Sequence, residues 1–156
     1  MSHTTKLKSV IIRDTSALVQ AVNDLRAQGV DCELRQNEKP RMYYANQHSE
    51  CDYVLRLNKS PYDVGFERQD DGTYVPVFDE WAGNISNEIG ANAHAPAGAT
   101  CPMPNTAEGK AQHQIGQFFQ QYAKHAAINA ATAQGYMVES ATTDEKGEIN
   151  LILSGM

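Results

Sequence analysis

The spacing of hydrophobic residues at the start of the chain changes from strand-like to helix-like. Residues 9–13 contain a Val-Ile-Ile run and predict a short buried strand. Asp14 or Thr15 can cap a helix that follows and runs to about Gln28, where Gly29 supplies the stop. One face of this helix is apolar at helical spacing, which is typical of a helix that covers a sheet. That face consists of Leu18, Val22 and Leu25.

Four further predicted strands precede residue 80, two of them in a hairpin. Residues 32–44 predict a strand broken by a polar, proline-containing turn, and residues 52–57 alternate clearly between two faces. Residues 62–78 predict a β-hairpin, because two aromatic and β-branched runs flank an Asp-Asp-Gly turn. Pro76 has no N–H to donate to a neighbouring strand. We therefore expect its strand at a sheet edge or beside a bulge.

The second half of the chain predicts a loop, a long helix and a final hairpin. Residues 82–107 are rich in Gly, Pro and small residues and predict a long surface loop or insertion. Residues 108–134 predict the longest helix, which Gly135 ends, and residues 136–153 predict two closing strands. The long helix carries an apolar stripe at spacings of three and four: Ile115, Phe118, Phe119, Tyr122, Ala126, Ala130 and Ala133.

The predicted order of elements is β-α-β-β-β-β-α-β-β, which indicates an α+β fold. Two strand-helix-strand-strand units in succession favour a mixed or antiparallel sheet with both helices on one face. Ferredoxin-like and tandem βαββ-like architectures both accommodate this order. At 156 residues the chain is the size of a single domain, residues 1–156, with the insertion at about 82–107 inside it.

Composition narrows the class of partner. The formal net charge is −6 at pH 7, so the long-range field repels polyphosphates and disfavours nucleic acid. No apolar run approaches the roughly 18 to 20 residues that span a bilayer, which excludes a membrane helix. Asp14 interrupts the only apolar stretch near the start, so we expect no signal peptide and a cytoplasmic location. Cys32, Cys51 and Cys101 are odd in number and widely spaced, which favours reduced thiols.

Candidate binding residues lie on the long helix and around the hairpin. Helical spacing places Tyr122, His125 and Asn129 along one line, where their polar tips can build a small pocket suited to binding or proton transfer. The alternative is that all three are packed residues with satisfied hydrogen bonds. Tyr74 and Trp81, in and after the hairpin, are candidate aromatic anchors for a partner.

Other clusters of metal-ligating or acidic side chains give weaker evidence for a functional site. The soft ligands His94, Cys101 and His113, or the pair His48 and Cys51, do not make the closely spaced pairs that structural zinc sites use, so we expect no metal and no cofactor. Carboxylates on or near the hairpin predict a solvated strand face rather than an acid-base pair. They are Asp63, Glu67, Asp79 and Glu80.

Several motifs together resemble a known family. The Met-Ser-His start, Tyr62–Phe66, Asp71–Tyr74, Trp81 and Gln121–His125 occur in one order and at distances similar to those of the hypothetical chloroplast reading frame thirty-five family. That family is a domain of unknown function of cyanobacteria, algal plastids and cyanophages, so the resemblance implies a lineage and a fold without implying a reaction. It covers most of the chain. The departure is the stretch from residue 85 to 114, where family members make a shorter connection.

These observations leave three hypotheses. The first is a non-enzymatic binding or regulatory module that recognises an unknown protein or small molecule with Trp81 and Tyr74. The second is a small-ligand receptor or enzyme that uses a pocket near Tyr122, His125 and Asn129. The third is self-assembly into a homodimer, in which a second copy of the chain covers an edge strand, either the Pro76 strand or the last strand.

Overall fold

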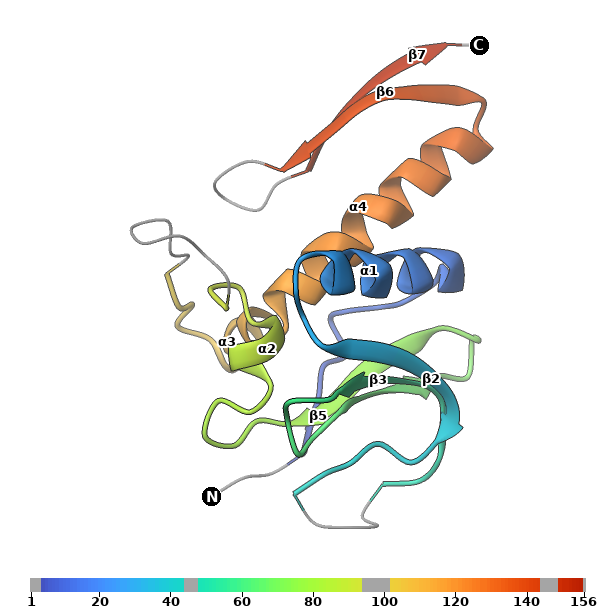
Figure 1. Ribbon diagram of the computed structural model, residues 1–156. Helices are drawn as coiled ribbons and strands as arrows, with labels where there is room; N and C mark the ends of the chain where they lie inside the picture. The colour runs from blue at the N-terminus through green and yellow to red at the C-terminus, as the bar shows by residue number, and fades with distance from the viewer. Residues whose placement is uncertain (1–3, 44–47, 94–101, 144–148, 156) are drawn as a thin grey trace.

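The computed structural model describes residues 4–43, 48–93, 102–143 and 149–155. These residues form an α+β fold in which helices cover one face of an antiparallel sheet (Figure 1). None of the helices in these ranges has the length and apolar character to cross a membrane. In chain order the elements are β1 (Thr4–Lys6), α1 (Thr15–Ala27), β2 (Cys32–Glu38), β3 (Cys51–Leu57), β4 (Val64–Arg68), β5 (Tyr74–Asp79), α2 (Ser86–Ile89), α3 (Ala107–Gln114), α4 (Gly116–Ala133), β6 (Tyr136–Thr143) and β7 (Ile149–Gly155).

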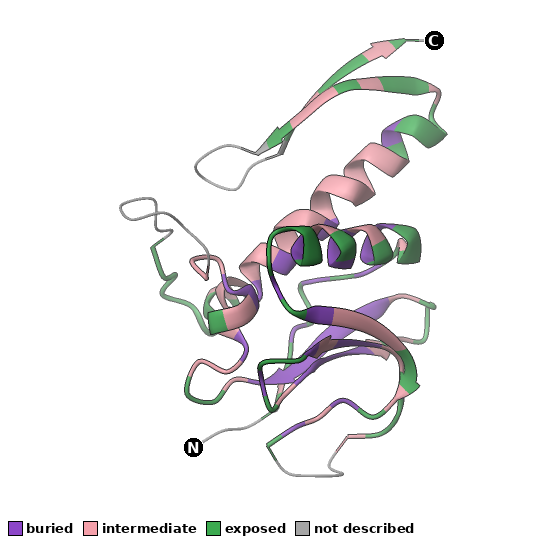
Figure 2. Cartoon of the chain, in the orientation of Figure 1, coloured by how far each residue is buried: buried purple, intermediate pink, exposed green. Residues whose placement is uncertain are grey.

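The main sheet has five strands in the order β1-β5-β4-β3-β2, and every neighbouring pair is antiparallel. The α+β class is therefore confirmed, whereas the ferredoxin-like order is not. Alternate residues of the inner strands point toward α1 and α4 and form the core, which appears as the purple interior of Figure 2. The largest fully buried side chains of this layer are Leu55, Leu57, Phe66, Phe78 and Phe118.

Helix α1 agrees with its prediction. The carboxylate of Asp14 accepts a hydrogen bond from the backbone N–H of Ala17 at 3.0 Å, and Gly29 adopts a φ of +98° just after the helix. The apolar face expected from the sequence is buried against the sheet.

The first strand lies earlier than predicted. Residues 4–6 form β1, and the segment 9–13 makes only one bridge, between Ile12 and Tyr74. Pro76 explains the interruption, because it offers a carbonyl to the N–H of Leu7 but no N–H in return. Of the two places predicted for the Pro76 strand, a sheet edge or a position beside a bulge, the sheet edge is wrong: β5 is an inner strand between β1 and β4.

The second face of the sheet is covered by chain that the sequence predicted as strand. Strand β2 ends at Glu38, and residues 39–43 are not a strand; Tyr44 lies outside the described residues. Pro40 packs so closely on β4 that a Cβ added to Gly65 would lie 2.8 Å from the Pro40 ring. Both faces of the central strands are consequently buried.

The predicted loop contains a short helix, and the predicted long helix is divided into two helices. Ile85 and Ile89, inside the expected loop, are fully buried in the core, and α2 forms between them. The expected helix breaks at Ile115 into α3 and α4. There the carbonyl of His113 accepts the N–H of Ala91 at 2.9 Å, so the loop supplies a hydrogen bond from outside the helix.

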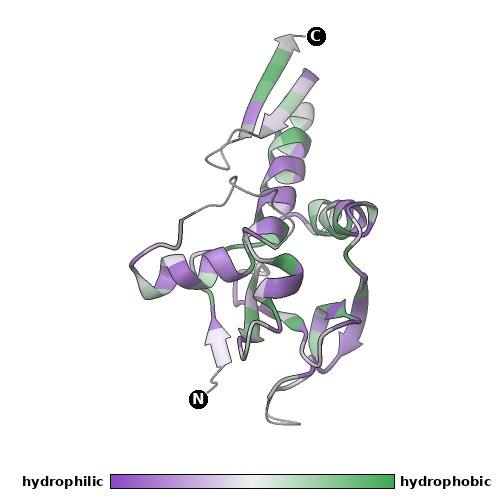
Figure 3. Ribbon diagram, turned by 60° about the vertical axis from the view of Figure 1, so that its left-hand side comes forward, coloured by the Kyte–Doolittle hydropathy of each residue, from purple (hydrophilic) through white to green (hydrophobic). Residues whose placement is uncertain are grey.

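The final hairpin, β6–β7, forms a separate two-stranded sheet at the far end of α4, away from the main sheet (Figures 1 and 3). Gly135, with a φ of +88°, makes the turn out of the helix, as predicted. The predicted turn at residues 144–147 lies outside the described residues.

Candidate functional site

Tyr122 and Asn129 fasten α4 to the beginning of α1. The Tyr122 hydroxyl oxygen accepts the backbone N–H groups of Arg13 at 2.9 Å and Asp14 at 3.2 Å. The Asn129 side-chain amide donates to the Asp14 carboxylate at 3.0 Å. This bond lowers the pKa of Asp14, against an opposing effect of burial. Both residues therefore hold two helices together.

His125 has a similar position one turn away. Its Nε2 lies 2.5 Å from a carboxylate oxygen of Asp24 on α1, and Lys124 lies 3.4 Å from the same oxygen. His125 is thus engaged by an acid and is not among the residues that line the neighbouring groove. Of the three residues predicted along one line, the structure brings only Tyr122 and Asn129 to a common cavity.

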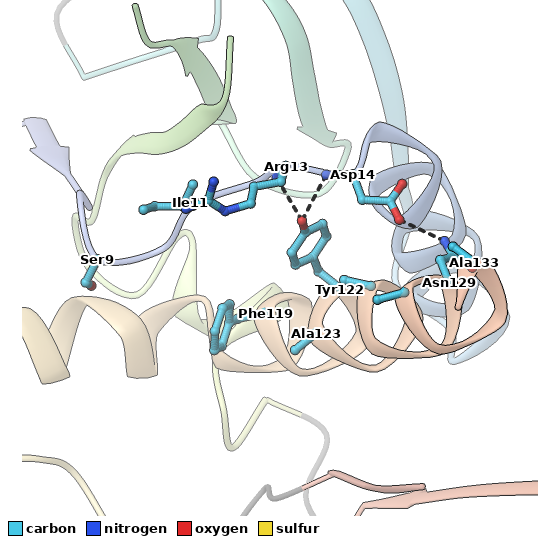
Figure 4. Close-up of a pocket in the computed structure, with 11 residues that line it drawn as sticks. Ser9, Ile11, Arg13, Asp14, Phe119, Tyr122, Ala123, Asn129 and Ala133 are labelled. Atoms are coloured by element: carbon cyan, nitrogen blue, oxygen red, sulfur yellow. Dashed lines mark hydrogen bonds between the residues drawn. The ribbon is translucent and has the colours of Figure 1, made fainter. Parts of the chain in front are cut away.

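That cavity is an apolar groove between the segment 9–14 and α4, with a volume of about 660 Å³ (Figure 4). The 9–14 side supplies most of the polar residues, and the α4 side consists of alanines, the two aromatic rings of Phe119 and Tyr122, and Asn129. The groove is lined by Ser9, Ile11, Arg13, Asp14, Phe119, Tyr122, Ala123, Ala126, Asn129, Ala130 and Ala133.

Cys51, His48 and Glu67 lie in a row that resembles a nucleophile, a base and an orienting acid. The Cys51 sulfur lies 3.6 Å from Nδ1 of His48, whose Nε2 lies 3.2 Å from Glu67. Burial raises the pKa of the Cys51 thiol to about 11, and the nearby Glu67 adds to this effect. The thiol is therefore protonated near neutral pH, and the row is not an activated nucleophile.

Metal chemistry gains no support from the part of the chain that the structure describes. Within it, no group of three or more His, Cys, Asp or Glu side chains could hold a metal ion. His94 and Cys101, which entered the sequence argument, lie outside the described residues.

An aromatic cluster forms where three segments meet beside the second face of the main sheet. The rings of Tyr43 and Trp81 lie 5.6 Å apart between centroids and are tilted by 54°, and those of Tyr43 and Tyr62 lie 6.3 Å apart, edge to face. Tyr43 and Trp81 are 41% and 39% exposed, so the cluster reaches the surface. We call Tyr43, Tyr62 and Trp81 the aromatic cluster.

Asp79 lies at the end of β5, next to this cluster. It is only 2% exposed, and its Oδ2 accepts the backbone N–H of Tyr43 at 2.7 Å. Its Oδ1 is buried and has no hydrogen-bond partner within the part of the chain that the structure describes. Burial raises the pKa of the Tyr62 phenol, and the charges of Tyr43 and Asp79 add to the shift. An acidic group therefore lies close to the aromatic rings, and among the described residues only one of its two oxygens accepts a hydrogen bond.

Asp63, the residue just before β4, is a buried aspartate whose two oxygens both accept hydrogen bonds. It is also 2% exposed, but Arg41 binds it through its backbone N–H at 2.9 Å and through its guanidinium, at 2.8 Å from Nη2. Leu57 adds a backbone N–H at 3.4 Å. The prediction of a solvated carboxylate face is wrong for both Asp63 and Asp79.

The sequence contained a signal for this burial. The residues of β5 that alternate with its core-facing ones are Val75 and Val77, so both faces of the strand are apolar and Asp79 continues a buried row. Tyr43 and Tyr62 had no such signal. Tyr74, the second predicted anchor, is at the opposite end of β5, where its hydroxyl donates to Asp52 at 2.9 Å and its ring contacts Tyr53.

Comparison with known proteins identifies no relative of this chain. A scan against protein-family models finds no match, and searches of the curated proteins and of the solved structures find none either. Any inference about function therefore depends on the geometry of the sites.

Proposed function

We propose that this chain is a non-enzymatic binding module that holds a basic side chain, lysine or arginine, of a protein partner on the aromatic cluster. The single observation that carries the proposal is the buried Oδ1 of Asp79, which has no hydrogen-bond partner among the described residues and lies near exposed aromatic rings. A buried polar group without a partner lowers stability by about 1–3 kcal/mol. A cation that reaches this oxygen removes that penalty.

The aromatic rings supply the second attraction. A cation within about 6 Å of an aromatic centroid is stabilised by roughly 0.5–2 kcal/mol, most strongly by tryptophan. Trp81 and Tyr43 present ring surface to solvent and share one neighbourhood with the Asp79 carboxyl group. A lysine or arginine side chain can use both attractions at once, whereas a neutral side chain can use neither.

The charge of the chain favours the same class of partner. A net charge of −6 accelerates the approach of basic surfaces and repels acidic ones. The resemblance to the hypothetical chloroplast reading frame thirty-five family would place such a partner in a cyanobacterial or cyanophage-infected cell, and this lineage is part of the proposal.

The only tryptophan of the chain gives a direct test, because its fluorescence reports on the cluster. The probe is acetyl-arginine amide, with acetyl-citrulline amide as its neutral counterpart. We expect Trp81 fluorescence to saturate with the cationic probe at a Kd on the order of millimolar, and to change little with the neutral one. Asp79→Asn should weaken binding by about tenfold.

Asp70→Asn is the matched control, since it removes the same charge from an exposed turn far along the hairpin. Equal weakening by both substitutions would reduce the effect to net charge and contradict the site. Equal binding of the two probes would contradict cation recognition altogether. Capture of partners from a cyanobacterial lysate with folded Trp81→Ala and His125→Ala variants then asks which protein carries the basic side chain.

The groove along α4 supports a second candidate function, the binding of a small apolar molecule. Its volume of about 660 Å³ falls within the roughly 300–1,000 Å³ of ligand pockets, and Arg13 and Asn129 place polar groups at its rim. Ala130→Phe should fill the groove and abolish the fluorescence of bound anilinonaphthalene sulfonate. Thr132→Phe, exposed on the same helix but outside the groove, should leave that fluorescence unchanged. An equal response of the two variants would contradict this candidate.

A further inference from the structure

The edge strands of the two sheets differ in how they are protected. β1 has only three residues and ends with Lys6, and β2 carries Glu33, Arg35 and Glu38, with Arg35 bonded to both glutamates. Short length and charge are the usual devices that keep sheet edges from pairing with other chains. The sequence of β7, Ile-Asn-Leu-Ile-Leu-Ser-Gly, contains no charge and no proline.

The hairpin also exposes apolar side chains on both of its faces. Val138 pairs with Leu153 and Ser140 with Ile152, so Ile152 and Leu153 point to opposite sides. Helix α4 lies on one side of the hairpin only, and β6 is the strand nearer to it (Figure 1). The exposed large side chains of the hairpin are Tyr136 (42%), Met137 (56%), Ile152 (57%) and Leu153 (40%).

The exposed area of these side chains is divided between the two faces of the hairpin. If a fully exposed large side chain presents roughly 200 Å², the four together expose on the order of 400 Å². This is about half of the ~800 Å² that each partner buries in a standard interface. Among the described residues, the outer backbone edge of β7 pairs with no strand, and this edge adds to the surface available for association. A two-stranded hairpin is at best marginally stable without further strands or packing.

We propose that β7 pairs with β7 of a second copy of the chain, antiparallel across a twofold axis, to make a four-stranded sheet. Full overlap of residues 149–155 puts Ile152 opposite its own copy and Leu151 opposite Leu153 of the other chain. Two copies of a chain with a net charge of −6 repel each other. An uncharged strand suits self-pairing, because it places no like charges opposite each other. β6 is the poorer edge for this purpose, since it carries Glu139.

Sedimentation velocity of the full chain over a range of concentrations tests the proposal. We expect a reversible dimer for the wild-type chain and at least about a tenfold higher dissociation constant for Ile152→Lys, which places two like charges opposite each other. Val19→Lys is the matched control, because Val19 is an exposed apolar residue of α1 at 44% exposure. It should leave the dimer unchanged. Far-UV circular dichroism and thermal melting establish that each variant is folded.

A cross-linking experiment keeps the proposal testable even if Ile152→Lys does not fold. Directly opposite residues of antiparallel strands have Cα atoms about 4.5–5.5 Å apart, within disulfide range. Ile152→Cys should therefore form a 152–152 disulfide between chains on mild oxidation, located by mass spectrometry. A wild-type monomer at every concentration, a dimer that Ile152→Lys leaves intact, or a dimer lost in Trp81→Ala would each overturn the proposal.

Discussion

Two buried aspartates, Asp63 just before β4 and Asp79 at the end of β5, are equally inaccessible but differ in their partners. Asp63 accepts hydrogen bonds from Arg41 and Leu57, and the Arg41 guanidinium balances its charge. Asp79 accepts one backbone N–H, and its second oxygen has no partner among the described residues. Burial alone therefore does not tell these two carboxylates apart, whereas the number of hydrogen bonds that each accepts does.

The largest effect is expected for Asp63→Asn. The substitution removes the charge that Arg41 pairs with and one acceptor from a fully bonded set, so the free energy of unfolding should fall by about 2–3 kcal/mol. Urea denaturation at pH 7 measures it. A loss below about 0.5 kcal/mol would mean that the Arg41 pair does not hold the sheet to the covering segment.

Asp79→Asn should have a much smaller effect on stability. The amide oxygen still accepts the Tyr43 N–H, and a neutral group is less costly to bury than a carboxylate. We expect the free energy of unfolding to change by less than about 1 kcal/mol, in either direction. A loss as large as that of Asp63→Asn would show that both aspartates are structural, and would remove the main support for the cation site.

Asp14→Asn should have the smallest effect of the three substitutions, and that effect should depend on pH. The pKa of Asp14 is lowered, chiefly by the Asn129 hydrogen bond, so its contribution to stability is present above the ordinary pKa of 3.8 and is lost as pH falls through the lower, folded value. Asparagine is as good an N-cap. We expect wild type and Asp14→Asn to differ more at pH 6 than at pH 3 in urea denaturation. Parallel curves would contradict the assignment.

The sequence predicted the parts of this molecule that local rules determine. The Asp14 cap, the Gly29 stop and the β4–β5 hairpin all follow from residues close together in the chain. The break at Ile115 and the burial of Ile85 arise from contacts between distant segments, which periodicity does not report.

The candidate site likewise combines a residue that the sequence predicted with residues that only the fold brings together. Trp81 was predicted as an anchor and lies in the aromatic cluster, but Tyr43 and Tyr62 approach it from other segments. Asp79 was interpreted as exposed because the sequence does not show that residues 39–43 cover the second face of the sheet. The alternation of residues along one strand does not show which segment packs against its outer face.

The place of β1 in the sheet has a consequence for how the protein is made. Thr4 pairs with Asp79, so β1 leaves the ribosome well before its partner β5 and has no strand to pair with until β5 has followed it. The β4–β5 hairpin, which needs only local contacts, can form before that pairing. During synthesis the β1 edge of the sheet is thus completed by a strand that is made long before its partner.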